Sequence, residues 1–170
     1  MTRVCVLISC ILLGISGVFG QRTAFRDSLL DEFAGTWVLR GTIAGKQTTH
    51  DVSAEWILGH EYLQFREISR EKDTAGGPAY EALVTIGWDA PSSQYVCLWL
   101  DNTSGAGLNG ILAYARREPD RIAFLFKSKD GSLFHTIFVR ERKSDSWRWL
   151  MDQEENGRTE PFARVAMERR

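Results

Sequence analysis

The sequence predicts an all-β protein, a single antiparallel up-and-down β-barrel of about eight to ten strands with a short N-terminal helix plugging one end. The segment Phe33-Ala34-Gly35-Thr36-Trp37 carries a Gly-x-Trp motif, which commonly opens the first strand of a small ligand-holding barrel. After Trp37, about ten short runs alternate apolar and polar residues between turn-forming clusters. No apolar helical pattern there is long enough to connect parallel strands, which argues against a parallel α/β sheet.

A short amphipathic helix is expected before the first strand. Phe25, Leu29 and Phe33 recur every four residues with charged residues between them, which is the spacing of one helical face. This face needs an apolar surface to cover, so we expect a helix of about two and a half turns to plug the floor of the barrel. Ten strands are expected after it, at residues 36–44, 49–58, 61–69, 79–88, 94–101, 108–116, 121–127, 132–141, 146–153 and 161–168.

Residues 1–20 are expected to be a secretory signal peptide. Arg3 precedes an apolar run from Val4 to Ile15, which is shorter than the ~20 residues of a membrane-spanning helix. We therefore expect cleavage before Gln21, a secreted or periplasmic protein with no membrane segment, and one barrel domain over residues 21–170. As an alternative, Leu7-Ile8-Ser9-Cys10 fits a bacterial lipoprotein signal, although it would leave a signal of only nine residues.

Charge and cysteine content narrow the classes of partner. Arg3 is the one charged residue of 1–20, so 20 basic and 22 acidic residues remain, a net charge of −2 with histidine neutral. The two signs are interspersed and form no basic stripe, so we expect no nucleic-acid partner. We also expect the chain to be a monomer. Cys5 and Cys10 leave with the signal, so Cys97 can form no intramolecular disulfide and is expected to be a buried apolar filler.

The aromatic residues supply the material for a ligand pocket. The chain holds six Trp, four Tyr and nine Phe, many of them alternating within the expected strands. Aromatic residues at this spacing also build solid cores, which is the competing interpretation. If a cavity exists, we expect eight large mid-strand aromatic residues to line it: Trp56, Tyr80, Trp88, Trp99, Tyr114, Phe124, Phe138 and Trp149.

Four segments, in this order and spacing, carry a family resemblance: Phe33–Trp37, Glu55–Gly59, Gly87–Asp89 and Tyr95–Asp101. Through them the chain resembles the calycin-type, lipocalin-like β-barrels, and most closely an uncharacterised family of bacterial secreted proteins. The resemblance implies a barrel with an interior site and no established general activity. It also implies that Trp37 packs at the barrel floor under a basic side chain from a late strand, for which Arg164 is the candidate.

Two motif searches give little support to catalysis. Gly105-Ala106-Gly107-Leu108-Asn109-Gly110 fits Gly-x-Gly-x-x-Gly, but a strand from Ile111 to Tyr114 follows where a dinucleotide site needs a helix. The mature sequence has no cysteine pair, no His-x-x-x-His and no serine elbow, so neither a metal site nor covalent catalysis is predicted.

The titratable candidates are few. His135 lies between Phe134 and Thr136 and is the best candidate for a haem ligand, against a histidine hydrogen-bonded within the barrel wall. His50 and His60 are expected at exposed strand ends. Asp101, with His135, Tyr80 or Tyr114 near it, is the weak catalytic candidate, against a turn-forming role before Asn102. Glu55, Glu61, Glu67 and Glu81 are expected to face outward in cross-strand pairs.

The function expected from the sequence is binding of a small, mostly apolar molecule in the barrel, with no chemical change and no cofactor. Three alternatives stay open: an enzyme that uses the same cavity, a haem-binding barrel, and a ligand-free interaction or stress protein whose barrel is filled by its own side chains. An inward-pointing Asp101 or His135 would favour the enzyme, and a cavity-free interior would favour the last alternative.

Overall fold

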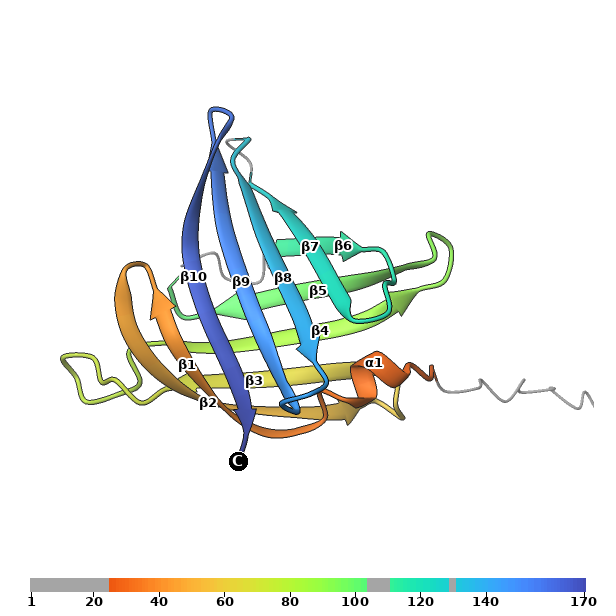
Figure 1. Cartoon of the computed structure of the whole chain (residues 1–170), viewed down its shortest axis with the longest axis horizontal. Coiled ribbons are helices and arrows are strands. Elements are labelled where there is room, and N and C mark those ends of the chain that lie inside the picture. The colour runs from red at the N-terminus through yellow and green to blue at the C-terminus, as the bar shows by residue number, and fades with distance from the viewer. Residues whose placement is uncertain (1–24, 104–110, 129–130) are drawn as a thin grey trace, which may run out of the picture.

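The computed structural model describes residues 25–103, 111–128 and 131–170, and it confirms an all-β, antiparallel, up-and-down barrel (Figure 1). Ten strands close into one sheet, in which each strand pairs with its sequence neighbours and the last pairs with the first. The predicted signal peptide, Cys10 and the Gly105–Gly110 motif lie outside the described residues. Within the described residues no helix is long and apolar enough to span a membrane.

The elements follow the predicted order, with small differences at their ends. They are α1 (Ser28–Asp31), β1 (Gly35–Ile43), β2 (Lys46–Ile57), β3 (Tyr62–Ser69), β4 (Glu81–Asp89), β5 (Gln94–Asp101), β6 (Ile111–Ala115), β7 (Arg121–Lys127), β8 (Leu133–Glu141), β9 (Ser146–Glu155) and β10 (Arg158–Arg169). Period-two burial explains the strands: in β7, the buried Ile122, Phe124 and Phe126 alternate with more exposed neighbours. A tight turn joins β9 and β10 at Asn156-Gly157, where both residues have positive φ.

The helix is shorter than the sequence predicts. Asp27 caps it by accepting hydrogen bonds from the backbone N–H groups of Leu29 and Leu30 at 2.9 and 3.0 Å. The chain leaves the helix after Asp31 and turns into β1 at Gly35, whose φ of 132° favours glycine. The four-residue apolar spacing therefore marks three residues that pack on or in the core, of which only Leu29 lies in the four-residue helix.

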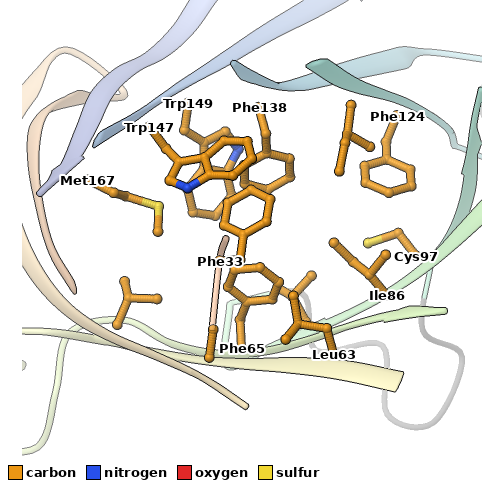
Figure 2. Packing of buried hydrophobic residues seen from close by; sticks show 14 of the residues in the cluster. Phe33, Leu63, Phe65, Ile86, Cys97, Phe124, Phe138, Trp147, Trp149 and Met167 are labelled. Carbon is orange, nitrogen blue, oxygen red and sulfur yellow. The ribbon is translucent and has the colours of Figure 1, made fainter. Parts of the chain in front are cut away.

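The half of the barrel nearest α1 is filled by side chains (Figure 2). Phe33 stacks on Trp147 with 3.5 Å between ring centroids, and its ring meets Phe65 and Phe138 edge-on at 5.0 and 5.3 Å. Trp37 is fully buried and donates its indole N–H to the Phe33 carbonyl at 2.7 Å. Cys97 is buried in the same core, as expected.

The basic partner of Trp37 is Arg169, and the prediction of Arg164 is wrong. The Arg169 guanidinium lies 4.3 Å from the centre of the Trp37 ring, and the two residues are direct cross-strand neighbours. Arg164 pairs with Thr42, toward the other end of the barrel, and binds Asp152 and two backbone carbonyls. The error arises because β10 continues to Arg169, which moves the floor of the barrel further along the chain.

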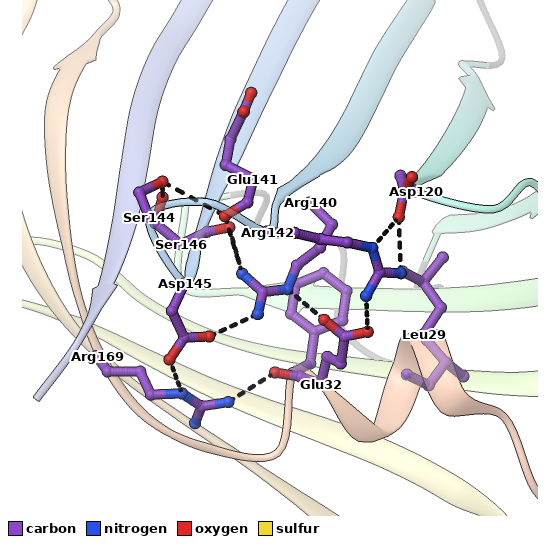
Figure 3. A network of polar contacts seen from close by, with 12 residues as sticks. Leu29, Glu32, Asp120, Arg140, Glu141, Arg142, Ser144, Asp145, Ser146 and Arg169 are labelled. Atoms are coloured by element: carbon purple, nitrogen blue, oxygen red, sulfur yellow. Dashed lines mark hydrogen bonds and ion pairs between the residues drawn. The ribbon is translucent and has the colours of Figure 1, made fainter.

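A polar network ties α1 to the turn between β8 and β9 and to the end of β10 (Figure 3). Glu32 accepts hydrogen bonds from Arg140 and Arg142, and Asp145 accepts from Arg140 and Arg169. Partial burial raises the pKa of Glu32. The hydrogen bonds and charges of the two arginines lower it by a larger amount, so the pKa lies below its ordinary value. Arg140, whose side chain is only 7 % exposed, is the buried centre of this network.

Candidate functional site

A cavity of about 810 Å³ occupies the end of the barrel away from α1. One part of its wall is apolar and is formed by Ile43, Trp99, Phe126, Phe134, Met151 and Phe162. The polar part is formed by residues of β2, β3, β5, β8 and the segment that follows β3. They are chiefly Thr48, His50, Glu67, Ser69, Glu71, Tyr80, Asp101 and Thr136. A mostly apolar concave site with a few convergent polar groups is the usual form of a small-molecule site.

The apolar wall is held in place by ring contacts between strands. Trp99 of β5 meets Phe126 edge-on at 6.1 Å and lies 5.4 Å from Trp149. Phe134 of β8 and Phe162 of β10 meet edge-on at 5.2 Å on another part of the wall. These contacts fix the aromatic faces before any ligand arrives, which lowers the entropy cost of binding.

The polar wall is built around a buried ion pair between His50 of β2 and Glu67 of β3. Their side chains are 5 % and 3 % exposed, and His50 Nδ1 is hydrogen-bonded to Glu67 Oε1. Charges this deeply buried are stable only when they are paired, so each residue requires the other. Their inward position corrects two expectations, since His50 was expected to be exposed and Glu67 to face outward.

The hydrogen-bond directions fix a proton on His50 Nε2. Thr48 donates its hydroxyl proton to Glu71 Oε2 at 2.8 Å, and its oxygen lies 2.8 Å from His50 Nε2. Because Glu71 can only accept, the Thr48 oxygen must accept from the His50 Nε2–H. Burial raises the pKa of Glu71, but hydrogen bonds from its own backbone, Thr48 and Thr49, with the positive charge of His50, bring it below the ordinary value.

Tyr80 connects the ion pair to the aromatic wall. Its ring lies against His50 with 5.6 Å between centroids, and its hydroxyl accepts a hydrogen bond from Trp99 Nε1 at 3.2 Å. Burial, with the negative charges of Glu67 and Asp101, raises the pKa of Tyr80 well above its usual range. The phenol therefore keeps its proton and can donate it to a ligand.

Two residues of the cavity wall each have a buried polar atom with no hydrogen-bond partner among the described residues: Glu67 with its Oε2 and Thr136 with its Oγ1. β3 and β8 are separated by four strands in either direction around the barrel, so these two residues belong to opposite walls. Buried polar groups in proteins are nearly always paired. The two atoms therefore mark positions where a ligand's polar groups would be stabilised.

The structure brings only two of the eight predicted cavity residues, Tyr80 and Trp99, to the cavity wall. Phe124, Phe138 and Trp149 are buried in the core next to it. Trp56 and Trp88 lie at the α1 end, where Trp56 Nε1 donates to Asp31 and Trp88 stacks on Phe25. Tyr114 is 47 % exposed on the outer face. Apart from Tyr114, the aromatic pattern identified inward faces, but it could not tell the filled end of the barrel from the hollow one.

The two weak catalytic candidates do not meet. Asp101 lines the cavity, but its Oδ1 accepts from the backbone N–H and hydroxyl of Thr103, both at 2.7 Å, as the turn-forming interpretation expected. His135 is not part of the cavity wall and forms an ion pair with Glu154 at 2.9 Å. The geometry therefore does not support His135 as a haem ligand inside the barrel.

The sequence did contain a signal for the pair that was missed. Glu67 follows Leu63 and Phe65 at two-residue spacing, and all three are buried on the same face of β3. His50 is in the same phase as the buried Val52 and Ala54 of β2. Extending the inward alternation through these polar residues would have placed both in the barrel interior.

A scan against protein-family models finds no match for this chain, and a search of curated proteins finds no similar sequence. Among the described residues, no group of three or more His, Cys, Asp or Glu side chains is arranged to hold a metal ion. The interpretation of the site therefore rests on the cavity and its own contacts.

Proposed function

We propose that this chain is an exported, monomeric, lipocalin-like binding protein that holds a small, mostly apolar molecule in the cavity. The observation that carries the proposal is the 810 Å³ cavity, with its fixed aromatic wall and its few buried polar groups. In this proposal α1 and Phe33 plug the opposite end, so the molecule enters between the strand ends that surround the cavity. The resemblance to calycin-type barrels supports the same use of the interior.

An enzyme that uses the same cavity is the second candidate, because Thr48, His50 and Glu67 follow one another as a nucleophile, base and acid do in hydrolases. The hydrogen bonds argue against that role. Thr48 gives its proton to Glu71, and His50 Nε2 is itself a donor, so His50 has no free lone pair with which to activate Thr48. The same argument leaves His50 without a nitrogen for a haem iron.

The proposal is tested by native mass spectrometry of the exported form, compared with its denatured mass and an absorption scan. We expect a small molecule to be bound or, after delipidation, binding of the neutral apolar probe N-phenyl-1-naphthylamine. Trp99→Ala should weaken probe binding about tenfold, since it removes a large apolar face of the cavity. The control is Trp56→Ala, which removes the same side chain at the α1 end. A clean mass with no probe binding would refute the proposal, and a Soret band would favour the haem alternative.

A further inference from the structure

We infer that the molecule held in this cavity is an amphiphilic amine, whose ammonium group lies against Glu67 and whose apolar body lies along the aromatic wall. This inference rests on the proposed binding function and adds the chemistry of the ligand's polar end. Three features of the cavity support it: the unpartnered oxygen of Glu67, the charges of the lining and the aromatic rings beside them.

Glu67 Oε2 is the first observation. Glu67 is a lining residue of the cavity, its side chain is almost fully buried, its Oε1 is bound to His50, and its buried Oε2 has no partner among the described residues. A carboxylate oxygen can only accept hydrogen bonds, so the group that satisfies it must be a donor. An ammonium group is a strong donor to it, because its hydrogen bond to a carboxylate is charge-assisted.

The charges of the cavity point the same way. Its described lining holds three carboxylates, on Glu67, Glu71 and Asp101, and two basic side chains, on His50 and Lys46. His50 is already paired with Glu67, and Lys46 is exposed at the rim. Outside this compensated pair, the carboxylates of Glu71 and Asp101 outnumber Lys46, so the described lining disfavours a ligand carboxylate, and no arginine lies in it to bind one.

Aromatic rings beside Glu67 complete the match to a cation. Tyr80 lies against His50, and the hydrogen bond between Trp99 Nε1 and the Tyr80 hydroxyl holds the two rings in fixed positions. The faces of Trp and Tyr attract cations, and this attraction grows when the site excludes water. On the opposite wall, the unpartnered Thr136 hydroxyl can accept from a second donor on the ligand.

The test compares three ten-carbon probes that differ only in their head group: decylamine, decan-1-ol and decanoate. Each displaces N-phenyl-1-naphthylamine from the exported form of the full chain at pH 7 and moderate salt. We expect decylamine to bind at least about tenfold more tightly than decanoate, with decanol between them. Decanoate binding as tightly as decylamine would overturn the inference while leaving the proposed function standing. Failure of all three, and of the fluorescent probe itself, would overturn both.

Two variants assign the head group to Glu67. Glu67→Gln keeps the shape and a hydrogen bond to His50 but removes the charge, so the preference for decylamine over decanol should be lost. Glu55→Gln makes the same change on an exposed residue of β2 and should leave all affinities unchanged. Decanol affinity and circular dichroism report whether Glu67→Gln still folds. If it does not fold, Glu67→Asp, which keeps the charge but shortens the side chain, serves instead, and an unchanged decylamine affinity in the folded variant would overturn the placement.

Discussion

Thr136 is an unfavourable residue for the stability of the barrel alone. It is fully buried on the inward side of β8, its hydroxyl has no partner among the described residues, and its cross-strand neighbours are Phe124 and Met151. Burying an unpaired hydroxyl costs about 1–3 kcal/mol, whereas valine has the same shape and no polar atom. The contacts of the described residues therefore give the hydroxyl no stabilising role in folding.

Thr136→Val should therefore raise the free energy of unfolding of the ligand-free protein by about 1 kcal/mol. Urea denaturation of delipidated protein, followed by tryptophan fluorescence, measures this difference. Thr85→Val, which makes the same change on β4 outside the cavity lining, is the matched control and should have a smaller effect. A loss of stability in Thr136→Val would mean that the hydroxyl has a structural partner.

Arg169 gives a second prediction at a single residue. Its guanidinium covers the Trp37 ring, donates to the carbonyls of Glu32 and Ala34, and pairs with Asp145. Arg169→Gln removes these contacts and should lower the free energy of unfolding by about 1 kcal/mol. The loss is small because the side chain is partly exposed and solvent screens its charge. Arg148→Gln, which removes one exposed ion pair with Glu141, should cost less. Equal losses in thermal denaturation would argue against a special role for the Trp37 contact.

At the scale of elements, α1 is held by its cap more than by its length. A four-residue helix has almost no intrinsic stability. Asp27 is buried and accepts from two backbone N–H groups of α1 and from the Tyr95 hydroxyl at 2.8 Å, and it pairs with Arg117 at 2.9 Å. The element therefore depends on one carboxylate that connects it to β5 and to the segment before β7.

Asp27→Ala should lower the free energy of unfolding by about 2–4 kcal/mol, since it removes the cap and leaves the Tyr95 hydroxyl buried without its acceptor. Hydrogen exchange should show the Leu29 and Leu30 amides losing protection before the strands do. Asp73→Ala removes another carboxylate that accepts backbone N–H bonds, those of Ala75 and Gly77 in an exposed loop, and should have less effect on global stability. Unchanged exchange at Leu29 would show that α1 is held by its apolar contacts alone.

The strands could be predicted from the sequence, because side chains alternate between the two faces of a strand and the apolar residues therefore recur at every second position. The end of β10 could not, since cross-strand register decides that Arg169, and not Arg164, lies beside Trp37. The His50–Glu67 pair was missed because charged side chains are usually exposed, and only the closed barrel shows that this pair is internal and mutually compensated. Local alternation also could not show which end is hollow, because the packing of Phe33, which precedes the first strand, against Trp147 of β9 is a long-range contact.

At the scale of the whole molecule, the barrel is divided between a half packed with core side chains and a half that contains the cavity. The first half holds the Phe33 and Trp147 stack and the Arg140 network, and the second holds the cavity. Ionisable groups with shifted pKa values occur in both halves, including Tyr95 near α1 and Tyr80 at the cavity. The pH dependence of the free energy of unfolding therefore reports on both halves of the barrel.

We expect the barrel to be most stable between about pH 5 and pH 9 and to lose stability on both sides. The pKa values of Glu32, Asp51, Glu71 and Asp145 are lowered in the fold, so their stabilisation is present above the unfolded pKa of about 4 and is lost as the pH falls through the folded values. The pKa values of Tyr80 and Tyr95 are raised, with burial as the main cause. Their contribution is complete below about pH 10 and is lost as the pH rises toward the folded values.

The urea midpoint from pH 3 to pH 11 measures this dependence, and tyrosinate absorbance shows when the phenols ionise. Tyr80→Phe and Tyr95→Phe should each reduce the alkaline loss, because each removes a group that must stay protonated in the fold. Glu32→Gln should reduce only the loss of stability at acid pH, because the carboxyl group that it removes has a pKa lowered by Arg140 and Arg142. Adding decylamine at pH 7 should raise the midpoint in the wild type and less so in Glu67→Gln, because a ligand bound only by the folded state stabilises it by mass action. A midpoint that stays flat up to pH 11 would contradict the burial of Tyr80 and, with it, the closed aromatic wall of the cavity.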